Sequence, residues 1–285
     1  MSTYTPGDVS AVVCTLNSIA SIARCLESLR SAGVGELIVV DADSTDGSRH
    51  IAEQLADLVL SDPGTGLGNA RNVGIARTTG ALVLNMGSDN LIDADQLQLM
   101  IDDLERLGVQ GVSARTEIEG DSYSARGLNA WRKGRFVPGR SLIIGTPTLF
   151  VGELLRTHPY DSTTRFSDDS ELCERWAREL GARFAISTAC VQEIGKTSWE
   201  EVVVRCRMYG ISDHEIYSRG ARSGWPIGRR LKSAAHPLRV DLIEPLMRLT
   251  PAEALYSAPF LASFAGMRYW AWASAAVKER TSKGA

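Results

Sequence analysis

The stretch Gly80-Ala81-Leu82-Val83-Leu84-Asn85-Met86-Gly87-Ser88-Asp89-Asn90 decides the fold of this chain. Residues 81–85 are mainly apolar and have a glycine on either side, which predicts a short buried strand and not a helix. The chain then turns at Gly87-Ser88 and presents Asp89 beyond the end of the strand. Open α/β sheets bind ligands beyond the carboxyl ends of their parallel strands. Asp89 is therefore a candidate binding residue, with a helix N-cap or a turn as the structural alternative.

The composition is that of a globular protein, and it argues against a nucleic-acid partner and against cysteine-based chemistry. The chain has 285 residues, 44% of them hydrophobic, enough for one large domain or two of moderate size. Its net charge of −3 carries no signature of a nucleic-acid partner. The five cysteines include no C-x-x-C pair, so we expect core hydrophobes and not metal ligands or nucleophiles. Residues 1–9 lack the basic and apolar regions of a signal peptide, so the expected location is cytoplasmic.

Strand-like and helix-like segments alternate along the first 110 residues. Strands are predicted at 9–14, 36–40, 58–60 and 81–85, with helical spacing of apolar residues after each of them. This alternation predicts an α/β fold with a mostly parallel, doubly wound, Rossmann-like sheet. Right-handed crossovers would bring the loops after three of these strands to one edge of the sheet. The polar residues expected to converge there are Thr15, Asn17, Asp41, Asp43 and Asp89.

Five motifs in a fixed order carry a resemblance to a known family. They are Val12-Val13-Cys14-Thr15-Leu16-Asn17, the turn at residues 39–48, Ala70-Arg71-Asn72-Val73-Gly74, the stretch at 80–90, and Ser167-Asp168-Asp169 before a helix. Together they resemble the inverting family-2 glycosyltransferases with the GT-A fold, over residues 9–210. The resemblance implies a catalytic domain over residues 1–212, with a donor half at about 1–115 and an acceptor half at about 116–212. A helical, basic and amphipathic extension would follow over residues 213–285.

The resemblance also implies a reaction and a set of roles. The chain would transfer a sugar from a nucleotide-diphosphate sugar, with UDP favoured, to an acceptor hydroxyl with inversion. Asp169 would be the catalytic base, because inverting transfer needs a group that deprotonates the acceptor. The donor would be bound by Thr15, Asn17, Asp41, Asp43, Arg71 and Asp89. Asp89 would also hold Mg²⁺ or Mn²⁺, which prefer oxygen ligands and neutralise the leaving diphosphate.

Departures from the family pattern leave alternatives open. Gly87-Ser88-Asp89 stands where the family has Asp-x-Asp, so only one carboxylate is left for a metal. In that case the donor diphosphate would supply most of the metal ligands, or arginine and lysine would replace the metal in stabilising charge. A third alternative is that the chain has lost its activity. A catalytically silent sugar-nucleotide binding protein is therefore one alternative. A sugar nucleotidyltransferase is another, although residues 14–17 supply neither its glycine-rich loop nor its lysine.

Single residues have structural alternatives as well. Asp46 and Asp43 would suit a turn, and Asp168 a helix N-cap. Arg71 would suit a solvated helix surface.

The acceptor and the partners follow less directly from the sequence. The acceptor would be a saccharide, a lipid-linked molecule or a small molecule in polysaccharide or glycoconjugate biosynthesis. The basic residues 126–140 would either grip an anionic acceptor or donor diphosphate, or form a solvated mobile loop. Residues 254–277 are apolar and aromatic but contain Pro259 and Arg268, which argues against a membrane span. The C-terminal region would instead contact a membrane peripherally, pack on the catalytic domain or form a homodimer.

Overall fold

The computed structural model describes residues 3–62, 64, 66–162, 168–195 and 197–283. The chain divides into two compact units. The first, here called the sheet unit, comprises residues 1–117 and 138–194. The second, the helical unit, comprises residues 118–137 and 195–285. The predicted boundary at residue 212 falls inside a helix of the second unit, Trp199–Arg222.

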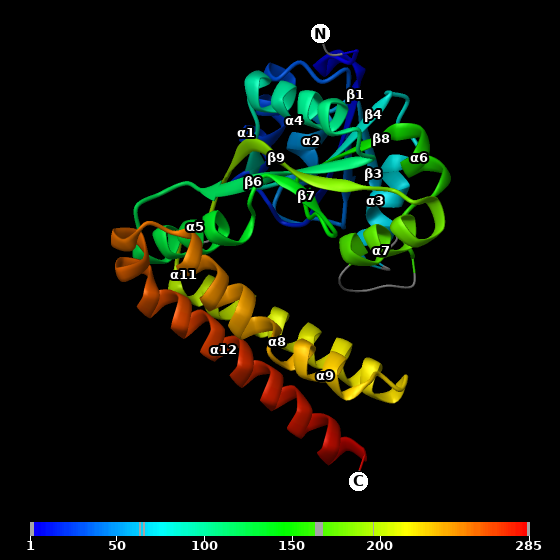
Figure 1. Ribbon diagram of the computed structural model, residues 1–285. Helices are drawn as coiled ribbons and strands as arrows, with labels where there is room; N and C mark the ends of the chain where they lie inside the picture. Colours follow the sequence, from blue (N-terminus) through cyan, green and yellow to red (C-terminus); the bar gives the residue numbers. More distant parts are fainter. Residues whose placement is uncertain (1–2, 63, 65, 163–167, 196, 284–285) are drawn as a thin grey trace. The chain divides into compact units, whose positions relative to one another are not determined.

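The sheet unit is built on one mixed sheet, and the predicted α/β class is confirmed (Figure 1). Its described strands are β1 (Val9–Thr15), β2 (Glu36–Asp41), β3 (Leu58–Ser61), β4 (Leu82–Gly87), β5 (Asn90–Leu91), β6 (Gly111–Ile118), β7 (Gly139–Ser141), β8 (Thr148–Val151) and β9 (Phe184–Glu193). The order is β3-β2-β1-β4-β8-β6-β9-β5, with β7 paired to β9. The first four strands are parallel, as predicted. Strand β8 is antiparallel to β4 and β6, so the parallel pattern covers only that half of the sheet.

Strand register brings the three polar corners to one edge of the sheet. Thr15 at the end of β1 pairs with Asp41 at the end of β2. Cys14 pairs with Gly87 at the end of β4, two residues before Asp89. The loops after β1, β2 and β4 therefore start level with one another, where open sheets bind ligands.

Helices cover both faces of the sheet. One apolar cluster joins the sheet to α1 (Ile22–Ser31), α2 (Ser48–Leu55) and α4 (Ala94–Leu107). A second cluster joins the opposite face to α3 (Leu67–Ile75), α6 (Gly152–Thr157) and α7 (Asp168–Leu180). Trp176 of α7 is fully buried between Phe150 and Phe184. Helices α3 and α7 are thus fixed on the same face, which matters for the site.

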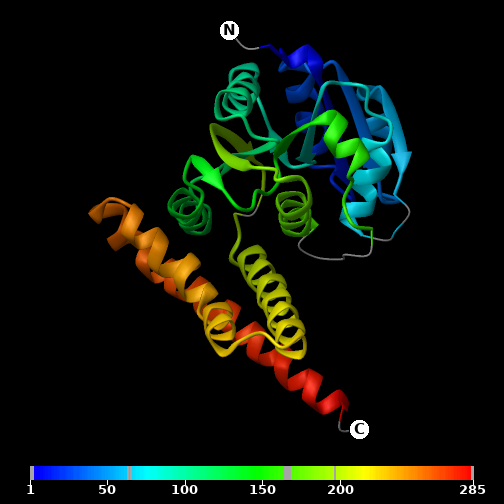
Figure 2. The same ribbon diagram turned by 45° about the vertical axis from the view of Figure 1, so that its right-hand side comes forward.

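The helical unit contains two long helices that lie side by side, α8 (Trp199–Arg222) and α12 (Pro251–Lys283) (Figures 1 and 2). A capping box formed by Ser198 and Glu201 begins α8. The other described elements are α5 (Tyr123–Arg135), α9 (Ile227–Ala234), α10 (His236–Leu238), the π-helical turn η2 (Arg239–Ile243) and α11 (Glu244–Arg248). Within the described residues, no helix combines the length and the apolar character that crossing a membrane requires.

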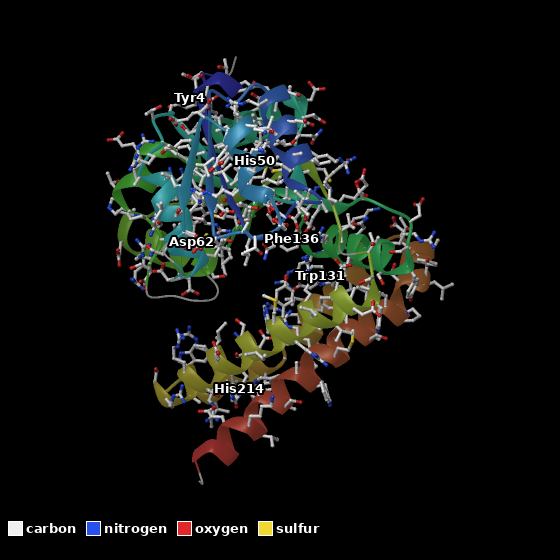
Figure 3. The ribbon with its side chains drawn as sticks, turned by 180° about the vertical axis from the view of Figure 1, so that it is seen from behind. Tyr4, His50, Asp62, Trp131, Phe136 and His214 are labelled. Carbon is white, nitrogen blue, oxygen red and sulfur yellow. The ribbon has the colours of Figure 1, made fainter. Side chains whose placement is uncertain are left out.

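Most of the basic segment 126–140 is a helix and not the mobile loop that the sequence left open. Leu128 and Trp131 of α5 pack on Phe260 and Phe264 of α12. Trp131 also meets Phe136 edge to face, with ring centroids 5.9 Å apart (Figure 3). This apolar contact is why α5, which the sequence placed in the acceptor half of the catalytic domain, belongs to the helical unit.

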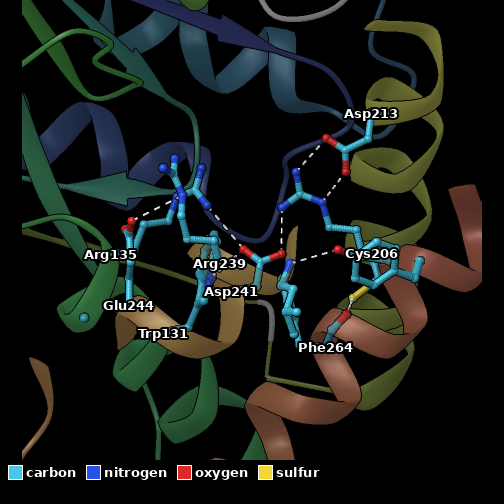
Figure 4. Close-up of polar contacts among 12 residues, drawn as sticks. Trp131, Arg135, Cys206, Asp213, Arg239, Asp241, Glu244 and Phe264 are labelled. Carbon is cyan, nitrogen blue, oxygen red and sulfur yellow. Dashed lines mark hydrogen bonds and ion pairs between the residues drawn. The ribbon is translucent and has the colours of Figure 1, made fainter. Parts of the chain in front are cut away.

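A buried carboxylate ties the helical unit together (Figure 4). Asp241 is fully buried, and its oxygens accept hydrogen bonds from Trp131 Nε1 at 3.0 Å and Arg268 Nη1 at 2.7 Å. Arg135 Nη1 lies 3.2 Å from Asp241 Oδ1. Arg268 forms a second, two-pronged pair with Asp213 of α8. The cation that argued against a membrane span is therefore neutralised inside the unit.

Candidate functional site

Asp41 ends β2 as a buried carboxylate with one oxygen unsatisfied. Its side chain is fully buried. Oδ2 accepts a hydrogen bond from the Ser44 amide at 3.1 Å and lies 3.6 Å from Arg49 Nη1. Oδ1 is buried and has no hydrogen-bond partner among the described residues. An unsatisfied buried acceptor is costly, so this oxygen points to a ligand that donates a hydrogen bond.

Thr15 and Asn17 follow the end of β1 beside Asp41. Thr15 is 4% exposed, and its Oγ1 is also buried with no hydrogen-bond partner in the part of the chain that the structure describes. Asn17 has a left-handed backbone, with φ of 48°, and its side-chain oxygen accepts from the Thr45 amide at 2.9 Å. Asn17 therefore links the loop after β1 to the loop after β2.

Asp43 and Asp46 differ from Asp41 in their surroundings. Asp43 is exposed in the turn, with φ of 56°. Asp46 Oδ1 accepts from the Ser48 hydroxyl at 2.6 Å and from the Ser48 amide at 2.9 Å. The Ser48 hydroxyl holds the pKa of Asp46 below its ordinary value. Asp46 thus makes the turn-stabilising contacts that were predicted as its structural alternative.

Asp89 lies at a cavity of about 380 Å³ beside the strand ends. The cavity lining includes Asn17, Arg71, Gly87, Ser88 and Asp89. It therefore combines residues from three of the loops or helices that the sequence singled out.

A side chain at residue 87, such as the first carboxylate of the family pattern, would require Asp89 and Asn90 to shift. A Cβ atom built on Gly87 would lie 2.8 Å from Asp89 Oδ1 and 2.9 Å from Asn90 Oδ1. The Gly87 amide donates to that Asn90 oxygen at 3.2 Å. Asp89 and Asn90 thus crowd the space next to Gly87 that a side chain would enter.

Arg71 and Asp169 are brought together although 98 residues separate them. Arg71, on α3, is 6% exposed, and its Nη1 lies 2.9 Å from Asp169 Oδ1 on α7. The alternative of a solvated helix charge is therefore wrong for Arg71. Asp168 begins α7, whereas the preceding motif residues 166–167 lie outside the described part of the chain.

Two side chains that contact Asp169, Tyr160 and Thr146, were not singled out from the sequence. Tyr160 Oη donates to Asp169 Oδ1 at 3.1 Å and accepts from Asn85 Nδ2 at the same distance. Thr146 Oγ1 accepts a hydrogen bond from Arg71 Nη2 and lies 3.5 Å from Asp169 Oδ2. The Arg71 guanidinium also lies over the Tyr160 ring, 5.2 Å from its centroid. Asn85 was visible as a polar residue in an apolar strand, but Tyr160 and Thr146 lie in irregular segments.

The residues suit a divalent ion only with oxygens from a ligand. Among the described side chains, no three His, Cys, Asp or Glu come together in a metal-binding group. Asp89 and Ser88 line the cavity, and their side-chain oxygens are hard ligands of the kind that a divalent cation prefers. One carboxylate with substrate phosphates and water is an ordinary arrangement for Mg²⁺. The site therefore fits a metal that arrives with a diphosphate.

Three of the five cysteines are buried core residues, whereas Cys14 and Cys190 are partly exposed. Burial raises the pKa of Cys25, Cys173 and Cys206 to about 12 in each case. The negative charge of nearby Asp89 also raises the pKa of Cys25. These thiols stay protonated at neutral pH, as expected for core residues.

Comparisons with known proteins bear on the fold and the family of the chain. Among curated proteins, the succinoglycan biosynthesis protein ExoO of Rhizobium meliloti (strain 1021) is 35% identical over 109 residues. That match covers 36% of this chain and 31% of ExoO, so the chain spans about a third of the length of this relative.

Two solved structures share the architecture. The mannosyltransferase PcManGT from Pyrobaculum calidifontis, in complex with GDP-Man and Mn²⁺, is 21% identical with a TM-score of 0.60. The alignment covers 97% of this chain and 87% of that one. S. aureus TarS 1–349 in complex with UDP is 17% identical with a TM-score of 0.51, covering 96% and 91% of the two chains. These likenesses confirm the GT-A fold.

A family model described as Glycosyl transferase family 2 matches residues 10–155, which include the strand ends, Arg71 and Asp89. Because that match spans half of the chain, the protein belongs to glycosyl transferase family 2.

Proposed function

We propose that the protein transfers a sugar from a nucleotide-diphosphate donor to an acceptor hydroxyl with inversion. The observation that carries the proposal is the Arg71–Asp169 ion pair beside the cavity that Asp89 lines. Inverting transfer needs a base for the acceptor proton and positive charge for the leaving diphosphate. A guanidinium and a carboxylate 2.9 Å apart supply both kinds of group. Family membership and the GT-A fold support this reaction class.

Asp169 is the proposed base. Its Oδ1 is held by Arg71 at 2.9 Å and by Tyr160 at 3.1 Å, which fixes the position of the carboxylate. The acceptor hydroxyl would give its proton to this carboxylate while its oxygen attacks the anomeric carbon, and the bond from that carbon to the diphosphate oxygen would break to release the nucleoside diphosphate. Arg71 would also stabilise charge on the diphosphate, because it lines the cavity.

The nucleoside is assigned to the strand edge at Thr15 and Asp41. A nucleobase N–H or a ribose hydroxyl would satisfy the unpartnered Asp41 Oδ1. Asn17 and Asp43 complete the proposed donor-binding loops. A hydrogen bond to a charged group contributes about 1.5–3 kcal/mol, so Asp41→Ala should weaken nucleotide binding about 10- to 100-fold by calorimetry. Unchanged affinity would remove Asp41 from the site.

Asp89 would hold Mg²⁺ or Mn²⁺ together with the donor diphosphate. When bound, the ion supplies positive charge at the leaving group. PcManGT was solved with Mn²⁺, which supports metal use in this fold. Because only one carboxylate is present, we expect metal to strengthen donor binding and not to be indispensable. Donor titrations with Mn²⁺ and with EDTA measure this directly.

UDP is favoured as the nucleotide, and the acceptor is a saccharide, a lipid-linked molecule or a small molecule. TarS was solved with UDP and PcManGT with GDP-Man, so a thermal-shift comparison of UDP, GDP and dTDP should precede sugar screening. A ligand present at 100 times its Kd adds about 2.7 kcal/mol of stability, a readily measured shift. The name of ExoO supports a place in polysaccharide biosynthesis. The cytoplasmic location stays a prediction.

The test of the reaction is Asp169→Asn, which keeps the size and most hydrogen bonding of the side chain. Nucleotide affinity and melting temperature should be retained, whereas kcat for transfer should fall about 100-fold or more. Asp168→Asn is the matched control and should be much milder. Transfer at near wild-type rate by Asp169→Asn would contradict the assignment of the base. Absence of both donor hydrolysis and transfer in the wild type would favour the silent binding protein.

A further inference from the structure

The two units of the chain carry opposite net charge. The sheet unit has 13 Lys and Arg against 24 Asp and Glu, a formal charge of −11. The helical unit has 18 Lys and Arg against 10 Asp and Glu, a formal charge of +8. A net charge of −3 for the whole chain therefore conceals a strongly basic helical unit. Charge asymmetry of this kind indicates a polyanionic or membrane partner for the basic part.

Exposed apolar side chains are concentrated in the same unit. Of the 23 large apolar side chains that are exposed among the described residues, 16 belong to the helical unit, which is the smaller of the two. Basic charge together with exposed apolar surface is typical of proteins that lie on a membrane interface. Nucleic acid would account for the charge but not for the apolar side chains.

A groove between α8 and α12 combines the two features. It has a volume of about 890 Å³ and is lined only by residues of these two helices. Its apolar part includes Ile211, 43% exposed, and Trp270, 64% exposed. Indole rings favour the membrane interface because they present an apolar face and one polar N–H.

The charged part of the groove has a surplus of cations. Four of its side chains are cationic: Arg207, Arg219, Arg222 and Lys278. Two are acidic, and one of these, Glu279, is already held by Arg222 at 3.0 Å and by His214 at 2.8 Å. His214 is labelled on α8 in Figure 3. A phosphate group would thus meet net positive charge beside Ile211 and Trp270.

Helix α9 repeats this combination within the unit. Ile227 and Leu231, one helical turn apart, are 74% and 65% exposed. Arg229, Arg230 and Lys232 lie between and beside them in the sequence. A short helix with this pattern is a typical interfacial element.

We propose that the α8–α12 groove binds phospholipids of an anionic bilayer and attaches the enzyme to a membrane surface. The cations would contact the headgroup phosphates, and Trp270 and Ile211 would enter the interface. A second copy of the chain is a poorer occupant, because a two-fold contact would place the same positive surplus opposite itself.

The test is cosedimentation of the full chain with lipid vesicles. Vesicles of phosphatidylcholine with about 30% phosphatidylglycerol should bind the protein, and pure phosphatidylcholine should not. Binding should fall at high salt, because the Debye length shortens. Arg207→Gln with Arg219→Gln should weaken binding about fivefold for each cation removed. Arg77→Gln and Leu99→Ser, both exposed in the sheet unit, are matched controls and should bind as the wild type does.

A second measurement uses Trp270 itself and does not depend on a disruptive variant. Phosphatidylglycerol with brominated acyl chains should quench the tryptophan fluorescence of the wild type, and Trp270→Phe should reduce that quenching. The proposal is overturned if the wild type shows no preference for phosphatidylglycerol vesicles. It is also overturned if the double arginine variant binds normally, or if light scattering shows a dimer that Trp270→Ser dissociates.

Discussion

Replacing Asp241 by alanine tests whether the buried charge network holds the helical unit together. The side chain is fully buried and faces three donors, Trp131, Arg135 and Arg268. In the variant Arg268 keeps its pair with Asp213, but Arg135 loses this buried partner and the Trp131 N–H loses its acceptor (Figure 4). The variant therefore removes the contacts of one carboxylate and leaves the rest of the network in place.

The size of the effect follows from these contacts. Removing one partner of a buried ion pair costs about 3–5 kcal/mol, because the other charge stays desolvated. Leaving the indole N–H without an acceptor costs about 1–3 kcal/mol, as for other unsatisfied buried donors. This cost overlaps with that of the broken ion pair, so the two do not add. We therefore expect a loss of about 3–5 kcal/mol in the unfolding free energy of the helical unit. Asp241→Asn keeps an acceptor for Trp131 and should cost less.

Tryptophan fluorescence during urea unfolding is the appropriate assay. Five of the six tryptophans, at positions 131, 199, 225, 270 and 272, belong to the helical unit, whereas Trp176 is buried in the sheet unit. The fluorescence transition should move to lower urea concentration in Asp241→Ala. Nucleotide affinity should be unchanged, because the proposed donor site lies in the sheet unit.

Glu244→Ala is the control for Asp241→Ala. Glu244 lies three residues further along the chain, is partly exposed, and faces Arg239 at 3.5 Å and Arg248 at 3.7 Å. An ion pair with this exposure contributes about 0–1 kcal/mol. If Asp241→Ala destabilises the unit no more than Glu244→Ala does, the reasoning about the buried carboxylate is wrong.

Three further predictions concern the sheet unit. Tyr160→Phe removes the hydroxyl that donates to Asp169, so kcat should fall about tenfold or more with unchanged nucleotide Kd, and an unchanged kcat would exclude Tyr160 as a positioning residue. Gly74→Ala would place a Cβ atom 2.5 Å from a valine methyl of β1, and calorimetry should show a lower melting temperature, because overpacking of about 1–3 kcal/mol outweighs the gain in helix propensity. The pKa of Asp103 is lowered because, against the effect of burial, it accepts hydrogen bonds from Arg106 and β9. The Asp103 carboxylate therefore stabilises the fold above about pH 4, and this stabilisation is lost as the pH falls further. In Asp103→Asn the free energy of unfolding should decrease less steeply toward acid pH than in the wild type, and an equally steep decrease would contradict this.

Local patterns in the sequence predicted the elements that position the donor side of the site. The strands predicted at 9–14, 36–40, 58–60 and 81–85 correspond to β1, β2, β3 and β4, with bounds that differ by two residues at most. The corners at Thr15, Asp41 and Asp89 were predictable because parallel strands end at one edge. These features depend on residues close in sequence or on a general rule of topology.

The features that the sequence did not predict depend on long-range contact. Tyr160 and Thr146 lie in irregular segments with no period to mark them, and only the fold brings them to Asp169. Helix α5 was hidden because its glycines and cations obscure the apolar spacing of Leu128 and Trp131. The buried pairing of Asp241 with residues up to 110 positions away could not be read from local charge.

The crowding beside Gly87 couples the choice of residue at position 87 to the side chains at positions 89 and 90. A single Gly87→Asp change would restore the family's first aspartate, yet its side chain would start 2.8 Å from Asp89 Oδ1 and 2.9 Å from Asn90 Oδ1. A second carboxylate next to that of Asp89 would be repelled by it unless a cation lay between the two. The effect of an aspartate at residue 87 therefore depends on the side chains at residues 89 and 90, which is epistasis between neighbouring positions.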